Sequence, residues 1–215
     1  MRLAAHHALR STARAGFTML EMLAVMVVLG ILVAFLIPNL LSTQEAAEMK
    51  ATKVKLAQIA TAIDQFERET GSYPPSQFLP EWGVAPNNKN LGVECLVLSL
   101  WSNGFEAGGS LSPDELVNVD GDRSAGSISD LPTSELLEFV DAWENPIAYI
   151  ESADYGREHP YDAFDAEGFE GEDMVKPLEN PTTGRFLNHA KYQLISAGPD
   201  GMFNTEDDIT HPELK

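Results

Sequence analysis

A long uncharged segment near the N-terminus places the strongest constraint on the fold of this chain. Residues 22–37 carry no charge, and the apolar character begins at Phe17 with one interruption, at Glu21. A helix needs about 20 apolar residues to cross a bilayer, so the segment predicts a transmembrane helix over residues 17–38. Residues 1–16 contain three arginines and no acid. Because basic flanks stay in the cytoplasm, the rest of the chain is expected on the far side of the membrane.

The N-terminal segment differs from an ordinary secretory signal. Such a signal has an apolar stretch of about 7–15 residues followed by a small-residue cleavage site. Here the apolar stretch starts directly after Gly16 and continues as a long helical pattern without such a site. Pro38 is expected to bend the helix where the apolar residues end, because proline lacks an N–H and clashes with the preceding turn.

Glu21 is the unusual residue of this segment. A carboxylate within an apolar spanning helix costs roughly 2.5–3.5 kcal/mol on insertion scales, so it is expected to have a partner. Cleavage after Gly16 would create a new α-amine on Phe17, one helical turn before Glu21, and a neighbouring subunit could supply the same amine. The alternative is a carboxylate that extends to the membrane interface and has no functional role.

The sequence Gly-Phe-Thr-Met-Leu-Glu at residues 16–21 resembles the processing site of type IV pilins and pseudopilins. The resemblance implies a leader peptide over residues 1–16, cut off by a prepilin peptidase between Gly16 and Phe17. It also implies N-methylation of the new amine and a role for Glu21 in subunit docking. The fold that it implies is α+β and type IV pilin-like: a long N-terminal helix, transmembrane and then amphipathic, packed on a small antiparallel β-sheet head with long loops.

An amphipathic helical stem is predicted over residues 39–71. Four apolar residues recur at spacings of three and four: Leu56, Ile59, Ile63 and Phe66. They form one stripe on a helix, and Gly71 follows as a stop signal. With the anchor, the pattern predicts a nearly continuous helix over residues 17–70, about 80 Å long at 1.5 Å per residue. The stripe is expected to pack against a globular head over residues 72–215.

Residues 139–150 are predicted to form a strand, a turn at residues 145–146 and a second strand. They resemble the Asp-Pro-Trp-Gly-x-x-Tyr segment of the major pseudopilins at three positions: Asp141, Trp143 and Tyr149. Ala142 and Glu144 replace the usual Pro and Gly, so the turn is open to a different geometry. Trp143 is expected to anchor the core rather than to bind a ligand.

The remainder of the head offers weaker patterns. Residues 81–135 and 152–186 exceed what the smallest pseudopilins need, and both are expected to be long surface loops. The apolar run 94–101 is too short for periodicity to separate helix from strand. Its Cys95 is expected to pack as a small apolar residue.

The C-terminal loop is crowded with oxygen-bearing side chains. A strand of alternating type is predicted over residues 192–196, followed by turns at Gly and Pro. Six candidates then lie within nine residues: Asp200, Asn204, Thr205, Glu206, Asp207 and Asp208. Such close carboxylates repel one another unless a cation neutralises them, and calcium accepts six to eight oxygens in irregular geometry where magnesium requires a stricter octahedron. The residues alone leave two interpretations, a calcium site and a solvated acidic turn.

The segment Ser-Ala-Gly-Pro-Asp-Gly followed by Thr-x-Asp-Asp-Ile resembles the calcium loop of the major (G-type) pseudopilins of type II secretion systems. The resemblance implies one calcium ion in this loop. It implies six ligands, namely the side chains of Asp200, Thr205, Asp207 and Asp208 and the backbone carbonyls of Ala197 and Met202. Asn204 is not expected to be a ligand.

A second group of oxygens lies at Asp120, Asp122 and Ser124. Its alternating spacing could hold a weakly bound cation. A plain polar turn is the favoured interpretation, because no bidentate Glu follows at the spacing of an EF-hand.

Composition disfavours several classes of function. The chain has 33 acidic and 14 basic residues and a formal net charge of −19, which disfavours nucleic-acid binding. Its single cysteine excludes the intrachain disulfide with which many surface pilins close their C-terminal loop. No nucleophile elbow, zinc-ligand spacing or phosphate loop occurs, so no enzymatic activity is expected.

The resemblance implies a structural subunit of the type II secretion pseudopilus. Such a subunit is a single-pass protein of the inner membrane with its head in the periplasm. It assembles into a helical homo-oligomeric filament that drives protein export across the outer membrane. The implied partners are the minor pseudopilins, the inner-membrane assembly platform and the prepilin peptidase. The alternative is a type IV pilus subunit for adhesion, motility or DNA uptake.

Overall fold

The computed structural model describes residues 16–102, 104–105, 111–164 and 170–213. The chain divides into two compact units, Met1–Gln44 and Glu45–Lys215. The predicted leader lies outside the described residues except for Gly16.

The first unit comprises, where described, the non-helical residues 16–18 and the first part of helix α1 (Met19–Thr70). Its stretch Met19–Ile37 has a mean hydropathy of 2.8 and is the one described helical segment long and apolar enough to cross a membrane. The large apolar side chains of this stretch are exposed, as an anchor requires. α1 continues through Pro38.

The second part of α1 packs into the core of the head. Leu56, Ile59 and Ile63 are fully buried, and Phe66 is half-buried against the same core. The helix ends at Thr70, where Gly71 takes a positive φ and its N–H still donates to the carbonyl of Glu67. The predicted stripe and the predicted helix end are therefore confirmed.

Three antiparallel strands form the central sheet in the order β3 (Ala148–Glu151), β6 (Tyr192–Ser196) and β7 (Ile209–His211). Tyr149 pairs with Leu194, and Ile195 pairs with Thr210. The strand predicted over 192–196 is thus confirmed.

The stretch 81–135 is not simply a surface loop, and this prediction was wrong. It contains helix α2 (Leu91–Leu100), which packs against β3 and against β2 (Glu138–Phe139). All residues of α2 except the first are buried. A helix that is buried on every side carries no amphipathic period, which is why the pattern could not separate helix from strand. Cys95 is fully buried, as predicted.

Shorter elements complete the stretch around α2. They are the 3-10 turns η1 (Pro80–Trp82) and η2 (Pro113–Glu115) and the strand β1 (Leu116–Val117), which pairs with β2.

The stretch 152–186 was also wrongly predicted as a loop. After the 3-10 turn η3 (Ser152–Asp154) it forms an antiparallel hairpin of β4 (His159–Phe164) and β5 (Glu170–Val175). Tyr161 and Val175 are buried in the core. The alternation was hard to recognise because acidic residues make up half of β5 and because β4 also buries a carboxylate, Asp162.

The turn within 139–150 lies earlier than predicted. Asp141 and Asn145 pair through their backbones, so the turn is made by residues 142–144 and the Asn-Pro pair begins the returning segment. The Asp141 carboxylate accepts the N–H groups of Trp143 (2.9 Å) and Asn145 (3.0 Å) and fixes this position. Glu144, at the usual glycine position, takes φ +68°. Trp143 is only partly buried against the core.

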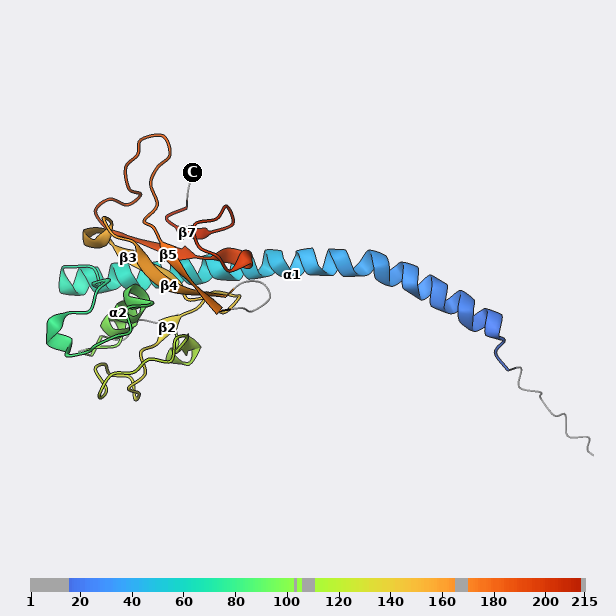
Figure 1. The fold of residues 1–215 in the computed structure, drawn as a ribbon, viewed down its shortest axis with the longest axis horizontal. Helices are drawn as coiled ribbons and strands as arrows, with labels where there is room; N and C mark the ends of the chain where they lie inside the picture. Colours follow the sequence, from blue (N-terminus) through green and yellow to red (C-terminus); the bar gives the residue numbers. More distant parts are fainter. Residues whose placement is uncertain (1–15, 103, 106–110, 165–169, 214–215) are drawn as a thin grey trace, which may run out of the picture. The chain divides into compact units, whose positions relative to one another are not determined.

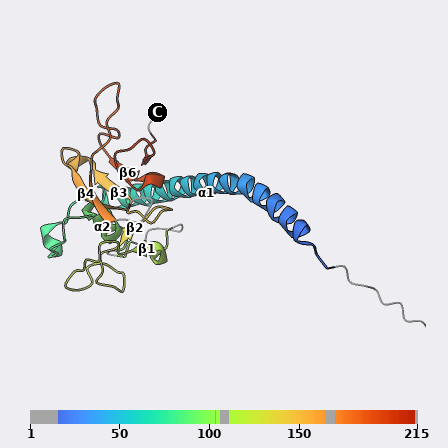
Figure 2. The same ribbon diagram turned by 45° about the vertical axis from the view of Figure 1, so that its right-hand side comes forward.

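Figure 1 shows α2 and β2 on one side of the second half of α1, with β7 on the other. Figure 2 keeps this arrangement after rotation, with β1 and β2 below the helix and β6 above it. The head is therefore an α+β arrangement built around its helical stem, as the sequence predicts.

Candidate functional site

The predicted processing site lies directly before α1. Gly16 and Phe17 are non-helical, and the Phe17 side chain is 73% exposed. An exposed, non-helical peptide bond is accessible to a peptidase.

Thr18 and Glu21 form a reciprocal capping box at the start of α1. Oε2 of Glu21 accepts the N–H (2.9 Å) and the hydroxyl (2.8 Å) of Thr18, while Thr18 Oγ1 accepts the N–H of Glu21 (3.2 Å). The spacing Thr-x-x-Glu before an apolar run is the sequence signature of this cap, which the sequence analysis did not identify. The Glu21 carboxylate thus has a partner within the unprocessed chain.

The C-terminal loop follows β6 and starts with the 3-10 turn η4 (Gly198–Asp200). Asp207 lies at its centre: one carboxylate oxygen accepts the N–H of Asp200 at 3.1 Å, and the other accepts the Thr205 hydroxyl. That hydroxyl also lies 3.2 Å from the carbonyl oxygen of Met202. Four of the six predicted ligand residues therefore meet in one hydrogen-bond network.

The remaining two predicted ligands flank this network. Ala197 follows β6 and is fully buried. Oδ2 of Asp208 accepts the N–H of Asn204 at 3.0 Å, whereas its Oδ1 is buried and has no hydrogen-bond partner. Within the described loop, Asp200, Asp207 and Asp208 do not form a set whose oxygens all lie within 4.8 Å of one another.

The loop residues suit a hard cation. The predicted donors are all oxygens, which is the ligand type that calcium prefers, and the orphaned Asp208 oxygen is a buried acceptor in need of a partner. Gly198 allows the loop to close, because a Cβ there would lie 2.4 Å from the carbonyl oxygen of Asp207.

The electrostatics of the two neighbouring acids differ. Burial raises the pKa of Asp208 to about 6. The hydrogen bond from the Asn204 N–H opposes this shift, and the negative charge of Asp207 adds to it. Burial also acts to raise the pKa of Asp207, but hydrogen bonds from Thr205 and from the Asp200 N–H outweigh it and lower that pKa. The loop therefore stabilises the charged form of Asp207, whereas burial disfavours the charged form of its neighbour Asp208.

The β4–β5 hairpin supports this loop. Oδ2 of Asp173 accepts the N–H of Phe203 at 2.8 Å, and the Asn204 amide donates to the carbonyl of Met174 at 3.1 Å. The buried ring of Phe203 lies 5.8 Å from that of Tyr161. The Asn204 side chain is thus held by β5.

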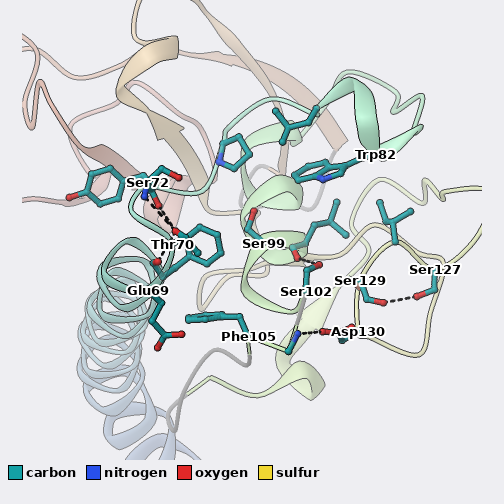
Figure 3. A pocket seen from close by; sticks show the side chains of 17 residues that line it. Glu69, Thr70, Ser72, Trp82, Ser99, Ser102, Phe105, Ser127, Ser129 and Asp130 are labelled. Carbon is teal, nitrogen blue, oxygen red and sulfur yellow. Dashed lines mark hydrogen bonds between the residues drawn. The ribbon is translucent and has the colours of Figure 1, made fainter.

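Figure 3 shows a cleft of about 780 Å³ between the end of α1 and α2. Its hydroxyls are engaged by nearby backbone: Ser99 donates to the carbonyl of Cys95, Ser102 to that of Leu98, and Thr70 to that of Phe66. The described lining contains neither histidine nor cysteine. We assign no chemistry to this cleft.

The N-terminal residues match a known family. The family described as "Prokaryotic N-terminal methylation motif" matches residues 11–37, which include the Gly16–Phe17 junction and Glu21. Type II secretion system core protein G of Vibrio cholerae serotype O1 is 30% identical over 113 residues, covering 49% of this chain and 75% of that protein. This chain belongs to the type II secretion system core protein G family. The resemblance to the major pseudopilins is therefore confirmed.

Other core G proteins match more of the chain. The Escherichia coli K12 protein is 27% identical over 196 residues, which cover 91% of this chain and 89% of the relative. The Pseudomonas aeruginosa PAO1 protein is 29% identical over 124 residues, covering 53% and 87% respectively. These relatives carry the name of a secretion-system protein and not that of an enzyme. No solved structure matched the chain.

Proposed function

We propose that this chain is a structural subunit of the type II secretion pseudopilus, without enzymatic activity of its own. The observation that carries the proposal is the methylation motif placed directly before a helix of membrane-spanning length, in a chain related to core G proteins over most of its length. The subunit would be anchored in the inner membrane with its head in the periplasm. Its filament would drive protein export across the outer membrane.

Assembly would depend on the exchange of partners at Glu21. In the unprocessed chain Thr18 satisfies the carboxylate through the capping box. Prepilin peptidase would cut between Gly16 and Phe17 and create a charged amine next to this cap. The amine of a neighbouring subunit would then offer the carboxylate a full opposite charge, which a hydroxyl cannot supply and which counts for most where water is excluded. This difference favours the filament over the free subunit.

Calcium would order the C-terminal loop. The residues that would hold it are Asp200, Thr205, Asp207 and Asp208 by side chain and Ala197 and Met202 by carbonyl. Bound calcium would neutralise the repulsion among the three carboxylates. The ordered loop would then present a fixed surface to neighbouring heads, to minor pseudopilins or to the inner-membrane assembly platform.

A type IV pilus subunit is the second candidate that the N-terminal motif alone would allow. The relatives are named as secretion-system proteins, which favours the pseudopilus.

Deletion of the chain in its native host tests the proposal. We expect exported proteins to accumulate in the periplasm while surface pili remain, and a plasmid copy to restore export. Normal export together with loss of surface pili would contradict the pseudopilus function.

A further inference from the structure

A cluster of acids lies inside the head, away from the C-terminal loop. The cluster consists of Glu94 on α2 and of Asp120 and Asp122 on the loop after β1. One carboxylate oxygen from each lies within 4.8 Å of the other two. No other described set of three acidic, histidine or cysteine side chains meets this distance. Two further buried acids, Glu138 and Asp162, lie close enough to act electrostatically on Glu94.

The Glu94 side chain has no partner inside the protein. The residue is fully buried, and neither of its carboxylate oxygens has a hydrogen-bond partner. Among the described residues, six buried side-chain polar atoms are left without a partner, and all six are carboxylate oxygens. Five belong to Glu94, Asp122 and Asp162, and the sixth is the Asp208 oxygen of the C-terminal loop.

Three neighbouring acids, unlike Glu94, accept hydrogen bonds from the protein. Glu138 accepts the amide of Asn90 at 3.2 Å and the N–H of Val119 at 3.0 Å, and Asp162 accepts the Lys89 ammonium at 2.7 Å. Asp120 accepts the Asn87 amide at 2.8 Å. The surroundings thus orient the cluster, while Glu94 keeps both oxygens unused.

We propose that Glu94, Asp120 and Asp122 form a second divalent-cation site, distinct from the C-terminal loop, that takes calcium. Oxygens bound to one calcium ion at 2.3–2.6 Å lie at most about 5 Å apart, and the three oxygens of the cluster satisfy this limit. A proton shared between two carboxylates would instead bring their oxygens into hydrogen-bond distance, which Glu94 does not show.

Burial and mutual repulsion both act on the acids of this cluster. Burial, followed by the charge of Asp122, raises the pKa of Glu94 to about 10, and burial raises that of Glu138 to about 8. A divalent cation bound among these carboxylates would displace protons from the ligands and offset the remaining repulsion. Asp120 and Asp122 are partly exposed, with exposed Gly121 between them, so the cation reaches the cluster from solvent at this turn.

The site would join distant parts of the head. Glu94 belongs to α2, which packs against β3, while Asp120 and Asp122 belong to a loop tied to β2 by the hydrogen bond between Val119 and Glu138. Cation binding would therefore fasten the 118–124 loop onto the core helix.

Calcium stoichiometry tests the proposal. The full-length chain is purified in detergent, stripped with a chelator and equilibrated with radioactive calcium by dialysis. We expect two ions per chain, one after Glu94→Gln, one after Asp207→Asn with Asp208→Asn, and none in the triple variant. The exposed Glu81→Gln variant is the control for loss of a carboxylate and should retain two.

The decisive comparison is made in the Asp207→Asn, Asp208→Asn background. Loss of the remaining ion on Glu94→Gln, and independently on Asp122→Asn, supports the second site. Binding that is absent in this background, or unchanged by Glu94→Gln, overturns it. If the Asp207→Asn, Asp208→Asn protein still binds two ions, calcium binding by the C-terminal loop is overturned instead. The two proposed sites can therefore fail separately. Circular dichroism confirms folding, which Glu94→Gln should preserve because the amide has the same shape as the neutral carboxyl that it replaces.

Discussion

Asp141 connects two segments of the head that are far apart in the sequence. Its Oδ1 holds the turn at 142–144 through two N–H groups, and its Oδ2 accepts the Ser196 hydroxyl at 2.6 Å. Ser196 Oγ in turn accepts the N–H of Gly198, the first residue of η4. Resemblance identified Asp141 as a notable residue, but its link to the C-terminal loop depends on a contact across 55 residues that no local pattern contains.

Asp141→Asn should destabilise the head by about 1–3 kcal/mol, because the amide cannot accept hydrogen bonds on both sides of the group and leaves a buried donor unsatisfied. Urea unfolding followed by tryptophan fluorescence measures the change. Ser196→Ala removes only one of these bonds and should cost less. Equal stability of Asp141→Asn and the wild type would show that this network does not hold the turn.

The β4–β5 hairpin is the element whose structure and role were hardest to predict from the sequence. Residues 152–186 were predicted to be a long surface loop, yet Asp173 and the carbonyl of Met174 hold the backbone of Phe203 and the side chain of Asn204. The periodicity of apolar residues revealed the stem, because one face of the second part of α1 is buried and the other is exposed. It could not reveal α2, buried on every side, or a strand whose exposed face is acidic.

Asp173→Asn should weaken calcium binding by the C-terminal loop. Replacement of a charged acceptor leaves the Phe203 N–H with a weaker hydrogen bond, and a loss of about 1 kcal/mol corresponds to roughly a fivefold lower affinity. Calorimetric titration of the Glu94→Gln protein isolates this loop. Glu172→Gln, the exposed neighbour on the same strand, controls for the lost charge. Equal affinities for the two variants would refute a supporting role for β5.

At the scale of the whole molecule, the proposed assembly would reconcile an acid in an apolar anchor with the membrane. The sequence alone predicted the anchor, the processing site and the role of Glu21. The capping box was not predicted, although the spacing Thr-x-x-Glu at residues 18–21 is its sequence signature.

Glu21→Val should leave the chain inserted in the membrane but outside the filament, because the docking carboxylate is lost while the anchor becomes more apolar. Membrane fractionation and cross-linking of heads measure the two properties. Thr18→Ala removes the capping partner and keeps the carboxylate, so it should still assemble. Filament incorporation of Glu21→Val at the wild-type level would contradict the pairing of Glu21 with a neighbouring amine.

The central claim is that the chain becomes a filament subunit only after cleavage between Gly16 and Phe17 and methylation of the new amine. Intact-mass and N-terminal peptide measurements on protein isolated from the native host test this claim directly. The account predicts a mature chain that begins with N-methylated Phe17. A chain that retains residues 1–16 in cells with active secretion would contradict it.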